Sequence, residues 1–353
     1  MTVATRRSET DDVVESTPEE PGRSGRTEGR PEGREIEARV GWRYTLREVG
    51  RDPTAMAGLL VVGVMTAMAV FATVDAVVFA SLARFEVFAR VGVRQYWIAE
   101  TLWVSPIAEP SPRLLPPVGM ENQFGRGTWA HPLGTDDRGR DILARIVYGS
   151  RIAIQVGIVS TLLGLVGGVL VGAVAGYYGD LVDDALMRAV ETLYAIPFLV
   201  LVLAVMAAFG RNLTFAILGV GIASIPTFAR LIRSRVLSVR EADYVEAARA
   251  AGVRDRNIIR RHVVPNSFAP VLVQATLQVG YSIIVVAGLS FLGFGAQPPT
   301  PSWGQMLSVS KDYMIQNVWF SIWPGLAILV TVVGFNVFGD GLRDALDPRL
   351  QNE

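Results

Sequence analysis

Residues 152–178 read IAIQVGIVSTLLGLVGGVLVGAVAGYY, an apolar run that contains no Asp, Glu, Lys or Arg. A helix needs about 20 apolar residues to cross the hydrocarbon core of a bilayer. Lipid offers no hydrogen-bond partners, so a segment that crosses it must satisfy its own backbone N–H and C=O groups. The run therefore predicts a membrane-spanning helix and an all-α fold.

Five further apolar runs surround this one. They cover residues 55–82, 193–209, 213–231, 268–294 and 318–338. The pattern predicts a polytopic membrane helical bundle with six transmembrane helices. The first run holds one charge, Asp75, in its distal third. We interpret Asp75 as marking a helix end near the lipid headgroups, and a site inside the membrane is the alternative.

The remaining segments are polar or rich in proline. Residues 1–47 cannot bury enough apolar surface to offset the entropy of ordering, and they lack the apolar core of a signal peptide. We expect the divisions that follow: a disordered tail at 1–47, a first transmembrane helix at 48–83, an external segment at 84–151, a transmembrane domain at 152–342 with a loop at 240–266, and a tail at 343–353. The stretch SPIAEPSPRLLPPVG at 105–119 is expected to be extended, either as a contact surface or as a spacer.

Arginines set the orientation of the bundle. Nine arginines lie between residues 230 and 261, from the end of the fourth span to the segment before the fifth, whereas the short connections at the other end carry only Arg211 and Lys311. Loops rich in Lys and Arg stay in the cytoplasm. The loop and both termini are therefore expected to be cytoplasmic, with residues 84–151 outside.

Small residues and prolines predict how the helices pack. Gly164, Gly168, Gly172 and Gly176 recur every four residues, which places them on one face of a helix. A face without side chains lets another backbone approach closely, and we favour this interpretation over a pore lining. Pro197 and Pro226 lie inside the third and fourth spans and should kink or open them.

Several kinds of chemistry are excluded by composition. The formal net charge is +0, which disfavours a nucleic-acid partner, and there is no cysteine for thiolate chemistry. The only lysine, Lys311, is followed by Asp312, so the chain has no Walker A motif for ATP. His131 and His262 are expected on opposite sides of the membrane and cannot share a metal ion. We expect no cofactor, no metal and no catalytic site.

The loop at 240–266 reads READYVEAARAAGVRDRNIIRRHVVPN. Good helix formers over 241–251 followed by Gly252 predict a short helix with a left-handed cap. A second short helix is expected to begin at Asp255 and to break at Pro265, before the fifth span. From the residues alone, a helix docked in a partner protein and a helix lying on the lipid surface are equally good interpretations.

Motifs in this loop and elsewhere resemble a known family. Glu246-Ala247-Ala248, then Gly252, then His262-Val263-Val264-Pro265 is similar to the EAA loop of ABC importer permeases, with His262 and Val264 replacing the usual Ile and Leu. HPLGTDDRGRDILARIVYGSR at 131–151, GFGAQPPTPSWGQML at 293–307 and DPRL at 347–350 resemble segments of the C-type permeases of dipeptide and oligopeptide importers. The resemblance covers about residues 47–350.

The resemblance implies a function and partners. It implies a multi-pass subunit of the cytoplasmic membrane that moves small peptides and works with separate ATPase subunits, a second homologous permease and an extracellular solute-binding protein. The residues that would contact the ATPase are Glu246, Ala247, Ala248 and Gly252, and Pro265 would set the direction of the fifth span. Nickel or a sugar is an alternative solute, and the rival classes are a secondary transporter and a membrane-bound enzyme.

Overall fold

The computed structural model describes residues 47–90, 92–107 and 112–346. Contacts divide the chain into the units Met1–Arg39 and Val40–Glu353, and every described residue belongs to the second unit. The tail expected at 1–47 lies outside the described residues except for Arg47, and so does the DPRL motif at 347–350.

The first long helix begins at a polar cap. Asp52 accepts hydrogen bonds from the backbone N–H groups of Thr54 (2.9 Å) and Ala55 (3.2 Å), and Pro53 takes the first helical position, where no N–H is needed. Helix α2 (Pro53–Thr73) then continues through the π-helical segment η1 (Val74–Val78) into α3 (Phe79–Leu82). Together these segments are long and apolar enough to cross a membrane.

Helix α6 (Ile142–Tyr178) begins well before the expected start at residue 152. Asp141 caps it, accepting a hydrogen bond of 2.7 Å from the N–H of Ala144. Its first three turns include the polar side chains of Arg145 and Ser150, which broke the apolar pattern of the sequence. Both side chains are buried inside the protein, so they do not meet lipid. The helix therefore extends further than hydropathy predicted.

The third span differs most from the expectation of one helix over 193–209. Two helices, α7 (Asp180–Ala195) and α8 (Phe198–Phe209), meet at a bend of 89°. Pro197 has no N–H, and the residue before a proline is pushed out of helical geometry. Ile196 accordingly has an extended backbone with ψ of 125°. Among the described residues, five helices could cross a membrane alone, and a sixth crossing requires the bent pair.

The other crossing helices are close to their expected ranges. They are α9 (Leu213–Val239), α13 (Ala269–Phe291) and α15 (Trp319–Leu346). The short connection 210–212 joins α8 to α9, and Asn212 caps α9 by accepting a hydrogen bond from the N–H of Phe215 (3.1 Å). Pro226 lies inside α9, and the helix continues beyond it to Val239.

The loop between α9 and α13 is helical throughout most of its length. It contains α10 (Asp243–Ala250), α11 (Asp255–Ile258), the π-helical η2 (Ile259–Val263) and α12 (Val264–Ser267). The expected break at Pro265 is wrong. The π turn is closed by a bond from the N–H of Val264 to the carbonyl of Ile259, and Pro265 then occupies the start of α12, where its missing N–H costs no hydrogen bond.

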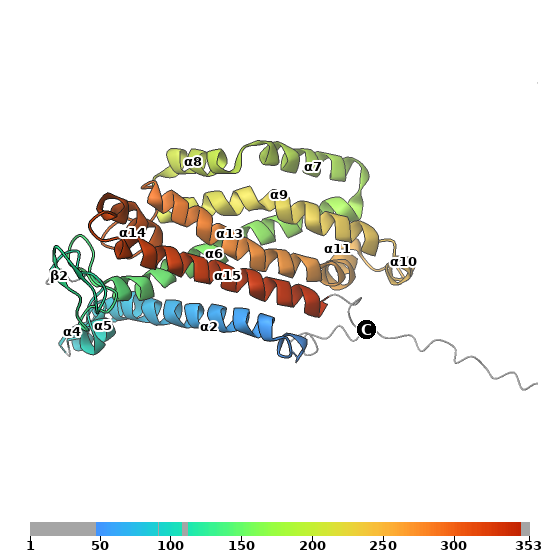
Figure 1. The fold of residues 1–353 in the computed structure, drawn as a ribbon. Helices are drawn as coiled ribbons and strands as arrows, with labels where there is room; N and C mark the ends of the chain where they lie inside the picture. The colour runs from blue at the N-terminus through green and yellow to red at the C-terminus, as the bar shows by residue number, and fades with distance from the viewer. Residues whose placement is uncertain (1–46, 91, 108–111, 347–353) are drawn as a thin grey trace, which may run out of the picture. The chain divides into compact units, whose positions relative to one another are not determined.

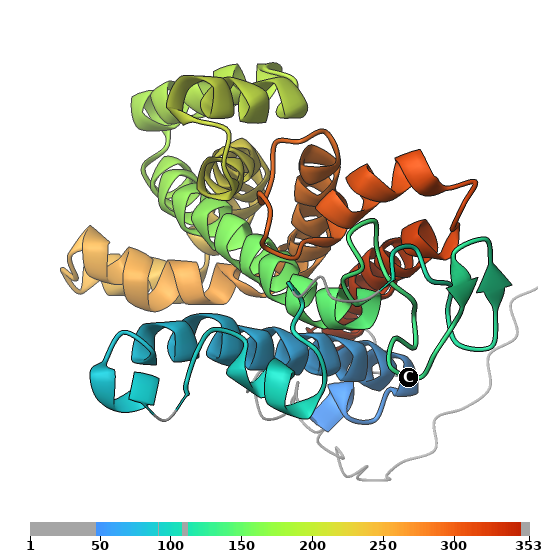
Figure 2. The same ribbon diagram turned by 90° about the vertical axis from the view of Figure 1, so that its left-hand side faces the viewer.

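The two ends of the bundle differ (Figure 1). One end carries α10 and α11, together with the start of α2 and the end of α15. The opposite end carries α4 (Glu86–Arg90), α5 (Trp97–Leu102), the hairpin of β1 (Glu121–Asn122) and β2 (Gly125–Arg126), α14 (Trp303–Ser310) and η3 (Lys311–Tyr313). Figure 2 views this second end directly, with the hairpin and α14 toward the viewer.

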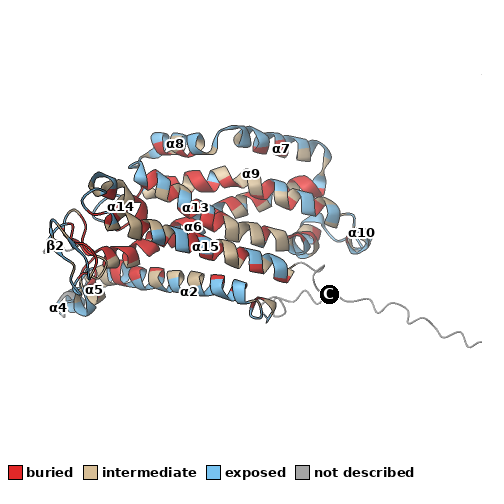
Figure 3. Ribbon diagram, in the orientation of Figure 1, coloured by how far each residue is buried: buried red, intermediate tan, exposed pale blue. Residues whose placement is uncertain are grey.

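Helix α6 lies at the centre of the bundle. It packs against α9, α13 and α2, and three buried apolar clusters of the described residues are arranged along it. Helices α7 and α8 form one edge and α2 the opposite edge, and both edges are largely exposed (Figure 3). Exposed large apolar residues along α2 and α8, such as Leu60 and Val200, are typical of a surface that faces lipid.

Candidate functional site

Helix α10 is held to the bundle through one face. Val245 is fully buried and belongs to an apolar cluster with Ile258 and Val263 from the same loop and Ile232 and Val236 from α9. Ala248 is half-buried against the same cluster. Because a buried side chain fixes the rotation of a short helix, the remaining face of α10 has a defined direction. This face points away from the bundle.

The expected partner-contact residues lie mainly on that outer face. Glu246, Ala247 and Gly252 are exposed, and Ala248 is half-buried at the edge of this face. Gly252 has φ of +75°, and a Cβ placed on it would meet no heavy atom within 4 Å. Pro265 is also exposed but lies further along the chain in α12, beyond the π turn. The structure therefore groups four of these residues in one segment and does not group Pro265 with them.

The end of α6 is tied to this loop by hydrogen bonds. The hydroxyl of Tyr177 donates to Asp255 Oδ1 at 2.7 Å, and Asp255 is the first residue of α11. Arg240 Nη1 donates to the carbonyl of Gly176 at 3.0 Å. Arg249 of α10 lies over the ring of Tyr177, 5.7 Å from its centroid. Movement of the loop would therefore reach the last turn of α6 directly.

An ion pair connects α7 to α9 near the same end. Arg233 binds Asp183 with both arms of its guanidinium, at 2.6 Å from Nε to Oδ1 and 2.5 Å from Nη2 to Oδ2. This paired geometry is directional as well as electrostatic. It fixes the amphipathic helix α7 against the part of α9 that leads into α10.

The glycines of α6 face α9 at very short range. A Cβ at Gly164 would lie 2.7 Å from the Cβ of Ser224. Cβ atoms at Gly168 and Gly172 would overlap Phe228 and the backbone of Ala229. Real Cβ atoms do not approach other atoms this closely, so any larger residue would force the two helices apart. The geometry is that of close backbone packing.

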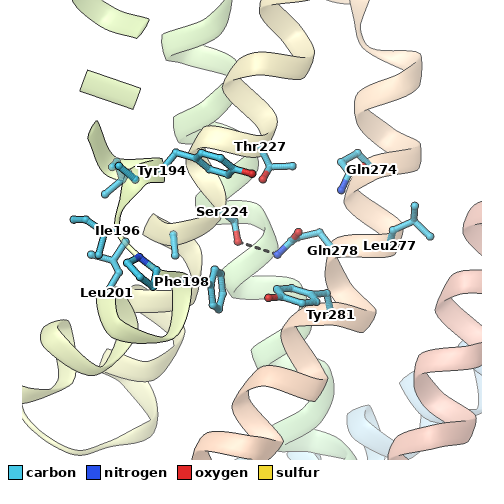
Figure 4. A pocket seen from close by; sticks show the side chains of 14 residues that line it. Tyr194, Ile196, Phe198, Leu201, Ser224, Thr227, Gln274, Leu277, Gln278 and Tyr281 are labelled. Carbon is cyan, nitrogen blue, oxygen red and sulfur yellow. Dashed lines mark hydrogen bonds between the residues drawn. The ribbon is translucent and has the colours of Figure 1, made fainter. Parts of the chain in front are cut away.

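A polar cavity lies where the third span is broken (Figure 4). It has a volume of about 640 Å³ and is bordered by the end of α7, the start of α8, and the middle parts of α9 and α13. Its polar side chains are Tyr194, Ser224, Thr227, Gln274, Gln278 and Tyr281. Gln278 is 7% exposed, and its Nε2 donates to Ser224 Oγ at 2.8 Å. The lining residues include no charged side chain.

Asp75 anchors the segment that follows the first span. Its carboxylate is fully buried and accepts hydrogen bonds from the N–H groups of Ile98 (2.8 Å) and Ala99 (3.0 Å) at the start of α5, and from the hydroxyl of Tyr148. A carboxylate at a helix N-terminus satisfies backbone donors that have no partner within the helix. Asp75 is thus bonded within the protein, in the π-helical segment near the end of the first span, and its position near the lipid headgroups stays a prediction.

The described part of the proline-rich stretch is folded rather than simply extended. Leu114 is in a left-handed turn with φ of 55°, and Leu114 and Leu115 are both buried. Asn317 Nδ2, just before α15, donates to the carbonyls of both leucines, at 3.3 and 3.0 Å. These bonds and the buried leucines show that this stretch is folded and not extended.

Burial raises the pKa of the Asp141 carboxyl, which caps α6 and pairs with His131 Nδ1 at 2.9 Å.

Comparison with known proteins identifies the family. Residues 168–352 match the family described as "Binding-protein-dependent transport system inner membrane component". The chain belongs to this family. The matched residues include the cavity, α10 and the Tyr177–Asp255 bond, so these three features lie within the part of the chain that defines this inner membrane component.

Curated relatives extend the match over most of the chain. The chain is 37% identical to the dipeptide transport system permease protein DppC of Alkalihalophilus pseudofirmus over 88% of this chain and 91% of that protein. It is 45% identical to the glutathione transport system permease protein GsiD of Pectobacterium atrosepticum over 63% of this chain and 74% of that protein. It is 40% identical to the di/tripeptide transport system permease protein DppC of Pseudomonas aeruginosa over 71% and 82%.

Sequence reasoning missed the cavity of this inner membrane component. A signal was present, because Gln274 and Gln278 lie four residues apart in an otherwise apolar span and therefore share a helix face. Polar side chains inside a membrane span usually face a partner or a water-filled space. The break at Pro197, which places Ile196 and Phe198 on the border of the same cavity, could not be derived from residue spacing.

Proposed function

We propose that this chain is the membrane permease subunit of an ABC importer for dipeptides or oligopeptides, and that separate subunits hydrolyse the ATP that drives it. The observation that carries this proposal is the exposed face of α10, which presents Glu246 and Ala247 while Val245 is locked into the bundle. The names of the relatives, which include dipeptide, di/tripeptide and glutathione permeases, support peptides as the solute class.

The proposed mechanism is mechanical. An ATPase subunit docks on the outer face of α10 and moves it when two ATPases close on ATP. The bonds of Tyr177 to Asp255 and of Arg240 to the Gly176 carbonyl pass this motion to α6. Because the glycine face of α6 lies against α9 without free space, α6 and α9 move together. Their motion would switch access to the path from one side of the membrane to the other.

The other partners and the orientation belong to the same proposal. The end with α10 is cytoplasmic, as are both chain termini, because the arginines of the loop gather there. A solute-binding protein delivers peptide at the opposite end, and a second homologous permease completes the path. Gly164, Gly168, Gly172 and Gly176 serve helix packing, and Glu246, Ala247, Ala248 and Gly252 contact the ATPase, with Pro265 directing the chain into α13.

Reconstitution of the whole importer tests this function. Proteoliposomes would contain this chain, its partner permease and the ATPases, with binding protein and a radiolabelled dipeptide outside and ATP inside. Uptake should require internal ATP and should continue when ionophores abolish every ion gradient. Uptake that follows an imposed ion gradient without ATP would instead indicate a secondary transporter.

A further inference from the structure

The cavity at the break between α7 and α8 combines features of a solute site. Ser224 lies near the middle of α9 and Gln278 near the middle of α13, so both are far from the polar ends of their helices. A volume of about 640 Å³ is within the roughly 300–1,000 Å³ of small-molecule pockets. The space is therefore large enough for a dipeptide.

The polar groups of the cavity are all uncharged. They are hydroxyls and primary amides, and each can both donate and accept a hydrogen bond. A Gln side chain carries the same C=O and N–H pair as a peptide bond. Gln278 and Ser224 bond each other, whereas Thr227 and Gln274 border the same space from α9 and α13 (Figure 4).

Such groups are costly where a helix faces lipid. An amide or hydroxyl without a hydrogen-bond partner is strongly disfavoured in hydrocarbon, so half-buried Thr227 and Gln274 need water, a solute or another chain beside them. The apolar part of the lining, which includes Ile196, Leu201 and Leu277, can contact apolar side chains of a solute.

We propose that this cavity is this subunit's contribution to the solute path, where the Thr227 hydroxyl and the Gln274 and Gln278 amides exchange hydrogen bonds with the main chain of a passing peptide. The inference rests on the proposed function, because it assumes that the solute is a peptide. The main chain is common to all peptides, so these bonds hold any sequence. The uncharged lining repels neither acidic nor basic side chains, and the guanidinium of Arg230, outside the lining, lies over the ring of Tyr194 at 3.7 Å from its centroid.

A charge placed in the cavity should therefore create selectivity that the protein lacks. Gln274→Glu keeps the shape of the side chain and adds a negative charge. In the reconstituted complete importer, with the binding protein saturated, the uptake rate of alanyl-lysine relative to alanyl-glutamate should rise on the order of tenfold over wild type. An unchanged ratio in a variant that still transports alanyl-alanine would overturn the inference.

A matched pair of threonine variants distinguishes the loss of a solute contact in the cavity from a change in helix packing. Thr227→Val removes a hydroxyl that borders the cavity, and Thr276→Val makes the same change on α13 where the side chain packs against Gly339 of α15. Alanyl-alanine uptake should fall about fivefold for Thr227→Val and stay near wild type for Thr276→Val, with equal amounts of assembled complex. Equal uptake by both variants would contradict a solute contact at Thr227.

The absence of cysteine allows a direct test of water access. Thr227→Cys and Thr276→Cys would each carry the only thiol of this chain. In the assembled importer, a charged methanethiosulfonate reagent should modify position 227 and leave position 276 unmodified, and saturation with alanyl-alanine should slow the reaction at 227. An unreactive thiol at 227 under all nucleotide conditions would mean that lipid or protein fills the cavity, and the inference would fail.

Measurements on the wild-type importer distinguish a failure of this inference from a failure of the proposed function. If wild type takes up none of the three dipeptides in the presence of ATP, the peptide assignment itself is wrong and the inference falls with it. If wild type transports all three dipeptides and the cavity variants behave like wild type, only the inference is wrong.

Discussion

The hydroxyl of Tyr177 donates a hydrogen bond of 2.7 Å to Asp255, which joins the last turn of the central helix α6 to the first residue of α11. The two residues are far apart in the chain, and the bond connects the loop that contains α10 directly to a helix of the bundle. The proposed transmission of motion depends on this connection.

Removal of the Tyr177–Asp255 hydrogen bond should weaken the coupling of ATP hydrolysis to transport without unfolding the protein. Tyr177→Phe keeps the ring that packs in the apolar cluster and deletes only the donor. We expect the ATP hydrolysed per peptide transported to rise roughly two- to threefold, because loss of one hydrogen bond shifts the equilibrium of the loop modestly. The ratio is measured by parallel ATPase and uptake assays. Tyr178→Phe, next to it and about half exposed, is the control and should leave the ratio at its wild-type value.

The contact between α6 and α9 should not tolerate one added methyl group. Gly168→Ala would push a Cβ into Phe228 and the backbone of Ala229, and overpacking of this kind costs about 1–3 kcal/mol. The midpoint of thermal unfolding in detergent should fall by several degrees. Gly288→Ala in α13, where a Cβ would meet no atom within 4 Å, should change it little. A Gly168→Ala variant as stable as Gly288→Ala would show that the two helices do not pack as described.

Gly252→Asp should abolish uptake and leave membrane insertion intact. Its φ of +75° makes any side chain cost about 1–2 kcal/mol of local backbone strain, but the chain itself leaves open space around the position. A loss of transport would therefore come mainly from the docking of the partner. Gly119→Asp provides the control, because Gly119 has φ of +83° and equally open space. Uptake by Gly252→Asp equal to that by Gly119→Asp would count against docking.

Asp75→Ala should release the segment that contains α5. The N–H groups of Ile98 and Ala99 would lose their acceptor, and each buried group left without a partner costs about 1–3 kcal/mol. We expect faster proteolysis within residues 83–107 of the purified protein. Tyr148→Phe removes one donor and leaves the carboxylate in place, so it should cause a smaller change. Identical proteolysis of Asp75→Ala and wild type would refute the anchoring role.

Hydropathy predicted the crossing helices because an apolar run of sufficient length has few other stable arrangements. It failed where polar residues face protein: Arg145 and Ser150 interrupted the pattern, yet both are buried within α6. A kink or opening of the third span at Pro197 was predicted, but the end of the helix and the bend of 89° were not, since a proline can end a helix or merely kink it, and tertiary packing decides which.

The candidate site was predictable only where local sequence determines the structure. Gly252 after an alanine-rich segment indicates a helix end from local chemistry alone. The role of Val245 as the anchor of α10 depends on contacts with α9 that no local pattern contains. The cavity requires residues from α7, α8, α9 and α13 at once, so spacing along one helix could show only that Gln274 and Gln278 share a face.

Cysteine crosslinking from the outer face of α10 tests the mechanical connection most directly. Ala247→Cys would be the only thiol of this chain, and Ile315→Cys, 100% exposed between η3 and α15, is the control at the opposite end. In the assembled importer we expect a short bifunctional reagent to join position 247 to an ATP-hydrolysing subunit, with a yield that changes between nucleotide-free and ATP-bound conditions, and to join position 315 to none. A position 247 that never reaches such a subunit under any nucleotide condition would contradict the proposed function.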